Sequence, residues 1–156
     1  MRFLCDEMLA RLARLLRAAG YDTYLAANGE DDAALVKLAR REGRILVTRD
    51  KRLAAAAEES VLVSGFGVDA VARSLSRAVV MDWAFAPFSR CVVDNAPLRD
   101  ATPGEVAALP GDTASLPGPF RVCPSCNRSY WPGSHVKRLS QKLNALARDA
   151  AIPPQA

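Results

Sequence analysis

Two apolar stretches of the chain each run directly into an aspartate. Residues 2–5 (Arg-Phe-Leu-Cys) precede Asp6, and residues 43–49 precede Asp50. An unbroken apolar run such as 45–47 (Ile-Leu-Val) is typical of a central parallel strand covered on both faces. Open sheets of parallel strands bind their ligands at the carboxyl ends of the strands. We therefore expect Asp6 and Asp50 to lie together at one edge of a sheet.

A third aspartate, Asp32, stands at the predicted start of a helix, on the side of the sheet where the loops that leave the strands gather. Carboxylates brought close together repel each other unless a cation lies between them. Mg²⁺ and Mn²⁺ take oxygen ligands, and one or two such ions can drive phosphodiester hydrolysis. The pattern favours a catalytic metal site made of Asp6, Asp32 and Asp50, with Thr48 placed to hold a carboxylate or a water. The alternative is that each aspartate only caps a helix.

Two cysteine-containing turns indicate a second metal site. Cys91-Val-Val-Asp94 and Cys123-Pro-Ser-Cys126 are separated by about thirty residues, which suits a zinc ribbon in which each turn presents two ligands to a tetrahedral ion. Asp94 stands where the second cysteine of the first turn would be. The single histidine, His135, is the alternative fourth ligand. A ribbon that has lost its metal and is held by packing is a further interpretation.

Basic residues favour a polyanionic partner. The net charge is +4, and arginines recur at three-residue spacing from Arg11 to Arg17 on one predicted helix, off its buried stripe. Basic groups that flank both metal modules could follow a phosphate backbone, and an aromatic side chain could stack on bases. A solvated helix face and a small core are the alternative. The residues predicted to contact RNA are Arg11, Arg14, Arg17, Arg49, Trp131, Lys137 and Arg138.

The order of the expected elements predicts an α/β fold with a parallel, doubly wound sheet. The pattern changes near residue 81, after which proline, glycine and small residues become frequent and a capping box at Thr102 predicts a short helix. We expect two domains, 1–87 and 88–156. The predicted strands are 2–5, 22–26, 45–47 and 61–63, and the main helices 8–19, 31–41, 51–59, 69–78 and 134–150.

Composition places the chain among globular proteins, with half of its residues hydrophobic and 24% charged. No apolar run approaches the roughly 20 residues that span a bilayer. Met1 leads almost directly into a strand without the features of an export signal, so a cytoplasmic location is expected. In that setting metal ligation is favoured over disulfides for the cysteines. Cys5, inside a strand, is expected to be a small buried hydrophobic residue.

The same residues resemble the Mut-seven C-terminal RNase-domain family over nearly the whole chain. The resemblance implies a PIN-like fold with a nuclease-type acidic site and a C-terminal zinc ribbon. Asp6, Asp32 and Asp50 fall on the acidic positions of that family, whereas Asp94 departs from a pattern that has cysteine there. Cys91, Cys123 and Cys126 fall on its zinc ligands. The matching segments are 3–6, 9–17, 20–23, 43–50, 90–91, Asn95, 123–126 and 130–135.

We therefore interpret the chain as a metal-dependent ribonuclease. One or two Mg²⁺ or Mn²⁺ ions would activate a water for in-line attack on phosphorus, leaving a 5′-phosphate and a 3′-hydroxyl, and Zn²⁺ would occupy the ribbon. One alternative is a non-catalytic RNA-binding or ribosome-associated adaptor. Another is the toxin of a toxin–antitoxin pair, which would bind an antitoxin, although the appended ribbon argues against it.

Overall fold

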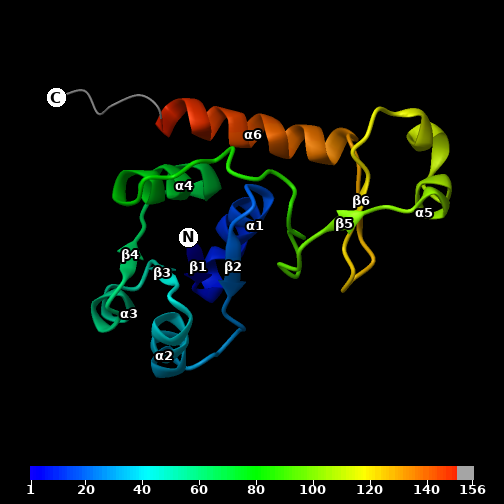
Figure 1. The fold of residues 1–156 in the computed structure, drawn as a ribbon. Coiled ribbons are helices and arrows are strands. Elements are labelled where there is room, and N and C mark those ends of the chain that lie inside the picture. The colour runs from blue at the N-terminus through cyan, green and yellow to red at the C-terminus, as the bar shows by residue number, and fades with distance from the viewer. Residues whose placement is uncertain (151–156) are drawn as a thin grey trace.

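The centre of the molecule is a four-stranded parallel sheet, seen in a computed structural model that describes residues 1–150 (Figure 1). Its strands run in the order β2-β1-β3-β4, and every neighbouring pair is parallel. The register pairs Phe3 with both Thr23 and Ile45, so β1 lies inside the sheet. The predicted α/β class is confirmed. The strands are β1 (Arg2–Cys5), β2 (Asp22–Leu25), β3 (Ile45–Thr48) and β4 (Ser60–Leu62).

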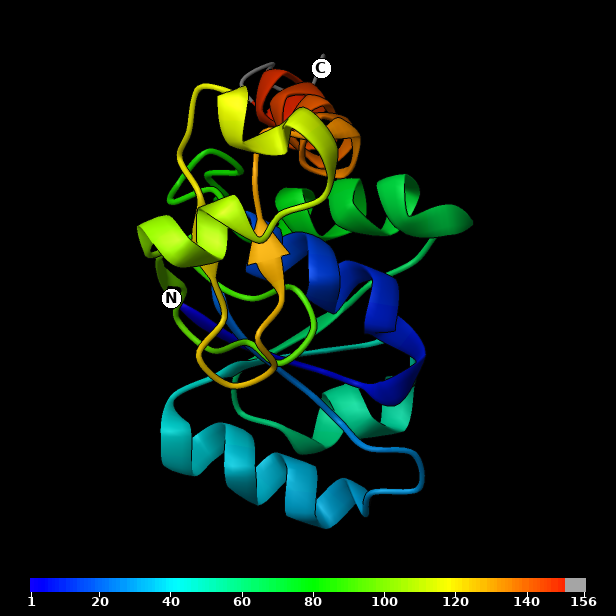
Figure 2. The same cartoon turned by 90° about the vertical axis from the view of Figure 1, so that its right-hand side faces the viewer.

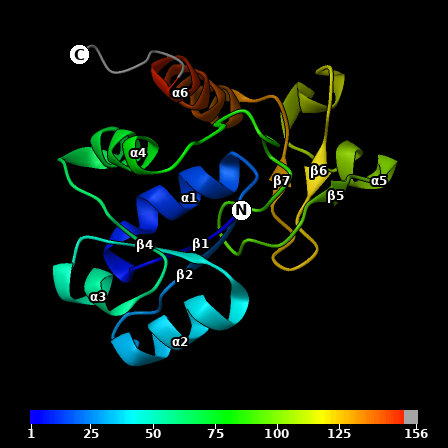
Figure 3. The same ribbon diagram turned by 60° about the vertical axis from the view of Figure 1, so that its left-hand side comes forward.

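Helices cover both faces of this sheet. Helices α1, α4 and α6 pack on one another above one face, and α2 and α3 contact each other below the opposite face (Figures 1 and 3). A 3₁₀ turn, η1 (Glu7–Leu9), precedes α1, so the helix predicted from residue 8 begins two residues later. The helices are α1 (Ala10–Ala18), α2 (Asp32–Glu42), α3 (Lys51–Ala56), α4 (Gly67–Ala78) and α6 (Ser134–Ala150).

The two helical layers explain why the central strands are apolar without alternation. Successive side chains of a strand point to opposite faces of the sheet. Phe3 and Cys5 therefore join the core beneath α1, α4 and α6, whereas Leu4 joins the smaller core beside α2 and α3. All three are fully buried. Cys5 is thus the buried residue that its position in the strand predicted.

Polar and glycine residues end the helices at defined positions. The Asp31 carboxylate accepts a hydrogen bond from the Ala34 N–H and caps α2. Gly43 ends the same helix with φ of +58°, a left-handed conformation that glycine adopts without steric cost. Asp50 caps α3 by accepting from the N–H groups of Arg52 and Leu53. The helices therefore start at the edge where the strands end.

A small antiparallel sheet of three strands, in the order β5-β6-β7, forms a second module, which is labelled in Figure 3 and faces the viewer in Figure 2. The predicted capping box is present, since Thr102 and Glu105 exchange their bonds at the start of α5. The remaining elements are β5 (Arg99–Asp100), α5 (Pro103–Ala107), the 3₁₀ turn η2 (Gly111–Ser115), β6 (Arg121–Val122) and β7 (Ser129–Tyr130).

Helix α6 returns from the small sheet to the main body. Its Leu143 and Leu146 belong to the same apolar cluster as Leu12 of α1 and Cys123 of the small module. The division into domains 1–87 and 88–156 stays a prediction, and residues 151–156 of the second lie outside the described part. Among residues 1–150, no helix has both the length and the apolar character to cross a membrane.

Candidate functional site

The strand order reverses at the carboxyl ends of β1 and β3. From β1 the chain moves outward to β2, and then crosses back over β1 to β3 and on to β4. The helices that follow β1 and β2 therefore leave toward opposite faces, so the ends of β1 and β3 form a topological switch point. In open α/β sheets, ligands bind at such switch points. Asp6 follows β1 and Asp50 lies just after β3, so both predicted acids lie at this switch point.

A buried threonine links these two acids. The Thr48 hydroxyl donates to Oδ2 of Asp6 at 2.8 Å and accepts from the backbone N–H of Asp50 at 2.9 Å. Thr48 is fully buried, so its position is fixed by the core. The helix-capping bonds of Asp50 fall on Oδ1, and Oδ2 is the oxygen available to a ligand. The prediction that Thr48 holds a carboxylate is confirmed.

Asp32 is exposed, as Asp50 is, whereas Asp6 is half-buried. Asp32 is the first residue of α2, and it lines an open hollow together with Asp50, Lys37 and Arg52. Among residues 1–150, one group of three or more possible metal ligands converges, with its ligand atoms all within 4.8 Å of one another. That group does not include Asp6, Asp32 or Asp50. The structure thus joins Asp6 to Asp50 through Thr48 and leaves Asp32 at the rim. Their catalytic role stays a prediction.

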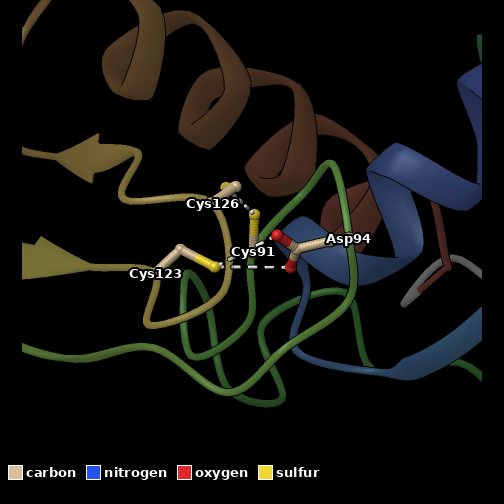
Figure 4. Close-up of side chains that lie close together, drawn as sticks. All are labelled: Cys91, Asp94, Cys123 and Cys126. Carbon is tan, nitrogen blue, oxygen red and sulfur yellow. Dashed lines mark hydrogen bonds between the residues drawn. The ribbon is translucent and has the colours of Figure 1, made fainter.

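The group that does converge is the predicted ribbon site. One ligand atom from each of Cys91, Asp94, Cys123 and Cys126 lies within 4.8 Å of all the others (Figure 4). The sulfurs of Cys91 and Cys126 are 3.7 Å apart, and the Cys123 thiol lies 3.2 Å from Oδ2 of Asp94. Three sulfurs and a carboxylate in this arrangement can hold a metal ion. His135 is on the exposed first turn of α6 and is not part of the group.

The two turns share one backbone fold, and within it Asp94 stands at the position that corresponds to Cys126. In each, the N–H four residues after the first cysteine bonds to its carbonyl: Asn95 to Cys91 and Asn127 to Cys123. Both asparagines have positive φ, 71° and 56°. Each cysteine N–H in turn bonds to the carbonyl five residues on. Asp94 and Cys126 therefore present their side chains from equivalent positions.

The carboxylate of Asp94 is held in its charged form. Burial acts to raise its pKa, but hydrogen bonds from the Cys126 thiol, the Ala96 N–H and the Cys123 thiol outweigh that effect and lower the pKa to about 2. The hydrogen bond to Asp94 correspondingly raises the pKa of Cys126 to about 12. A permanently charged oxygen ligand next to three thiols suits a divalent cation, which would release the thiol protons on binding.

A tyrosine and an asparagine support this site and were not predicted to do so. The Tyr130 hydroxyl donates to the sulfur of Cys91 at 3.1 Å and accepts from the Val92 N–H at 3.0 Å. The side-chain oxygen of Asn95 accepts from the backbone N–H of Thr23, on the outer strand β2, at 2.9 Å. The first turn is therefore fastened to the parallel sheet. Only the three-dimensional fold brings these groups together.

The prediction that three arginines lie off the buried stripe of α1 is wrong for Arg17. Arg11 and Arg14 are exposed, but Arg17 is 5% exposed. Its guanidinium donates to the carbonyls of Thr23 and Val93 at 2.9 and 2.6 Å. The reason is geometric: each three-residue step falls about 60° short of a full turn of a 3.6-residue helix. Two steps carry Arg17 about 120° around the helix, toward the core.

The other residues predicted to contact RNA are accessible. Arg49, Lys137 and Arg138 are exposed, Trp131 is half-buried, and their contact with RNA stays a prediction. Arg49 also donates to the backbone carbonyl of Gly65 at 2.7 Å.

The protein combines a parallel α/β sheet, with acids at its switch point, and a turn module whose cysteines and aspartate could hold a metal ion. The chain belongs to the Mut7-C RNAse domain family, whose sequence model matches residues 1–143. A human protein named exonuclease mut-7 homolog is 49% identical over 47 residues, which make up 30% of this chain and 5% of that protein. No solved structure is significantly similar to the chain. The family and this relative indicate a nuclease.

Proposed function

We propose that this protein is a metal-dependent ribonuclease that cleaves RNA phosphodiester bonds at the carboxyl edge of its parallel sheet. The observation that carries the proposal is the link from Asp6 through the buried Thr48 to Asp50 at the switch point. Mg²⁺ keeps several waters and is commonly bound through one or two carboxylates. Two linked acids, with Asp32 nearby at the rim, fit a hydrated Mg²⁺ or Mn²⁺ ion.

The residues of the chain hold and orient the reactants. Asp6 and Asp50 would hold the ion, and the hydroxyl of Thr48 keeps the Asp6 carboxylate and the backbone of Asp50 in place. When bound, the ion activates water and stabilises the leaving oxygen of an in-line displacement. The products carry a 5′-phosphate and a 3′-hydroxyl. Arg49, next to Asp50, lies where it can meet a phosphate of the substrate.

Exposed cations outside the acidic edge supply the remaining affinity for RNA. Arg11 and Arg14 stand on α1, and Lys137 and Arg138 stand on the first turns of α6. Such contacts bind phosphates without regard to sequence, so the affinity falls steeply as the salt concentration rises. Trp131, half-buried at the start of α6, offers a ring on which a base can stack.

In the ribbon, Zn²⁺ is the ion that the ligand set fits best. Thiolates select zinc over the hard cations of the acidic site. Two thiolates at about 2.3 Å from a tetrahedral zinc lie about 3.8 Å apart, and the sulfurs of Cys91 and Cys126 are separated by 3.7 Å. We assign the fourth ligand to Asp94, because His135 lies outside the group.

Cleavage of single-stranded RNA by the full-length chain tests the proposal. The purified protein is incubated with Mn²⁺, then with EDTA, and then with Mg²⁺ restored. Asp6→Asn and Asp50→Asn are expected to remove metal-stimulated cleavage, whereas Asp112→Asn, which neutralises an exposed acid on η2, is expected to leave it unchanged. Cleavage that persists in EDTA, or that survives both active-edge substitutions, would contradict the proposal.

A non-catalytic RNA-binding adaptor is the second candidate. It is favoured by the observation that Asp6, Asp32 and Asp50 do not all lie within 4.8 Å of one another. Tight, salt-sensitive RNA binding without cleavage in Mg²⁺ or Mn²⁺ would support this adaptor function over the nuclease.

A further inference from the structure

Phe66 stands wholly in solvent at the edge of the sheet. It lies in the loop between β4 and α4, and it is 100% exposed. Burial of a phenylalanine side chain is worth about 1.5–3 kcal/mol, and Phe66 gains none of this within the chain. What distinguishes it from an ordinary exposed residue is the loop that carries it.

This loop is held at three points. The guanidinium of Arg49 donates to the Gly65 carbonyl at 2.7 Å, and the Ser64 N–H donates to the hydroxyl of Ser74 on α4 at 3.1 Å. Gly65 has φ of +111°, and a Cβ added there would lie 2.7 Å from the Cβ of Ala70. A glycine is therefore required at residue 65. These contacts hold the backbone before Phe66, and α4 begins with the next residue, although the ring itself is fully exposed.

The same loop is tied to the acidic edge. Arg49 lies between Thr48, which links the two acids, and Asp50. The register of the sheet also pairs Thr48 with Leu62, four residues before Phe66. Two exposed cations, Lys51 and Arg52, follow Asp50 on the first turn of α3. An open aromatic ring, a set of cations and a pair of acids therefore share one edge of the molecule.

We propose that Phe66 stacks on an unpaired nucleobase of the RNA strand whose phosphate lies at the Asp6–Asp50 edge. The inference rests on the proposed function for the identity of the polymer. Cations that follow the phosphates and an aromatic ring that receives a base are the two features by which proteins bind single strands. Because every base has a π-face, such contacts tolerate any sequence but require a single strand. Phe66 thereby selects unpaired RNA and sets the register of the strand.

The test compares strands with and without bases. Binding of the full chain to a fluorescent, unstructured RNA 12-mer is measured by anisotropy, with Ca²⁺ in place of Mg²⁺. A strand of equal length and charge that carries no bases is measured in parallel. Since stacking of one base is worth roughly 1–3 kcal/mol, Phe66→Ala is expected to weaken binding of the RNA about 5- to 150-fold. It should leave binding of the base-free strand unchanged.

Two further variants make the test specific to an aromatic face. Phe66→Trp is expected to retain the affinity of the wild type. As a control, Phe85→Ala removes a second exposed ring. Phe85 lies near the end of α1, at the opposite edge of the sheet, where the N–H of Ala86 bonds to the carbonyl of Ala19. This variant should bind RNA within about twofold of the wild type, a change of roughly 0.4 kcal/mol. Thermal unfolding of each variant shows whether the fold is intact.

Three results would overturn the inference: RNA binding that is unchanged in Phe66→Ala, an equal loss for the strand without bases, or a Phe66→Trp variant as weak as Phe66→Ala. The outcome is separable from that of the nuclease test. If Phe66→Ala weakens binding only of the strand with bases, and no metal-stimulated cleavage is found, the stacking role is supported and the nuclease proposal is contradicted. If Phe66→Ala leaves both RNA cleavage and RNA binding unchanged, the nuclease proposal is supported and the stacking role is contradicted.

Discussion

The two candidate metal sites of this protein are assembled over different distances along the chain. In the ribbon, each turn supplies two ligands three residues apart and shapes them with its own backbone hydrogen bonds. At the acidic edge, Asp6 and Thr48 are 42 residues apart and meet only because β1 and β3 are paired. The ribbon site therefore depends on local geometry, whereas the acidic site depends on the whole sheet. Substitutions should affect the two sites independently.

Removal of the ribbon metal is expected to have the largest effect on stability. Cys123→Ala deletes a buried ligand, and the free energy of metal binding contributes to folding. We expect loss of stoichiometric zinc and a fall in Tm of about 10 °C, or roughly 3–4 kcal/mol for a chain of this length. Metal analysis and thermal unfolding measure both. Full zinc content in this variant would show that the turns do not form a metal site.

Asp94→Cys is expected to strengthen metal binding at the ribbon site, the opposite of the effect of Cys123→Ala. Because the two turns share one backbone fold, a thiolate at residue 94 should reach the ion without rearrangement. We expect zinc to bind about tenfold or more tightly, measured by competition with a chelator. RNA cleavage should change little, since the acidic edge is untouched. Weaker zinc binding would contradict the equivalence of Asp94 and Cys126.

Arg17 is expected to be next in importance because it joins the two regions. Arg17→Met leaves the carbonyls of Thr23, Val92 and Val93 without this donor. Buried groups left unsatisfied cost about 1–3 kcal/mol each, so we expect the free energy of unfolding to fall by about 2–4 kcal/mol. Arg14→Met, the same change on the exposed face of α1, should cost less than about 0.5 kcal/mol. Denaturant unfolding measures the free energy of unfolding of both variants. Equal losses in Arg17→Met and Arg14→Met would contradict this role of Arg17.

Thr48→Val tests the acidic edge alone. The substitution nearly preserves shape but removes the donor to Asp6 and the acceptor for the Asp50 N–H. We expect a loss of about 1–2 kcal/mol in unfolding free energy and a fall of about tenfold or more in metal-stimulated RNA cleavage, about 1.4 kcal/mol in activation free energy. Thr48→Ser should restore most of the cleavage, and zinc content should be normal in both. Wild-type cleavage by Thr48→Val would show that the link is not needed.

The smallest effect is expected at Asp22, where the outer strand meets the first metal turn. Burial acts to raise the pKa of Asp22, but hydrogen bonds from Arg44 and Asn95 prevail and lower it. A carboxyl group with a lowered folded pKa contributes stability above its unfolded pKa of about 3.9, and this contribution is lost as the pH falls through the folded pKa. Asp22→Asn should therefore flatten the loss of stability below about pH 4. Unfolding midpoints from pH 7 to 2 measure this, with Asp112→Asn as the control.

The sequence predicted most where the signal was local. The four ribbon ligands were expected because their spacing within each turn is short, although spacing alone left the choice between Asp94 and His135 open. The strands of the parallel sheet and the helices around it were also expected, since burial on both faces leaves unbroken apolar runs such as residues 45–47, whereas the short strands β5, β6 and β7 were not predicted. The structure added that the two turns have the same backbone fold, and it places Asp94, not His135, in the group that could hold a metal ion.

What the sequence did not predict depends on contacts between distant segments. Arg17 looked like a surface cation because its spacing from Arg14 matches that of an exposed face, and only the fold brings the carbonyls of Thr23, Val92 and Val93 to its guanidinium. Asn95 carries no signal for a bond to β2, and nothing near Phe66 in the sequence indicates a fully exposed ring on a held loop. The degree to which Asp32 approaches the other acids likewise depends on where α2 begins in space.

The hydrogen bond between Asn95 and the Thr23 N–H has a consequence for solubility. β2 is an outer strand, and the unpaired amides of an outer strand can template association with strands of another molecule. The side chain of Asn95 occupies one of these amides, so the ribbon shields the border of the sheet from neighbouring copies. Protein stripped of its metal should then self-associate at temperatures where the helices are still folded, and light scattering recorded beside circular dichroism would show it.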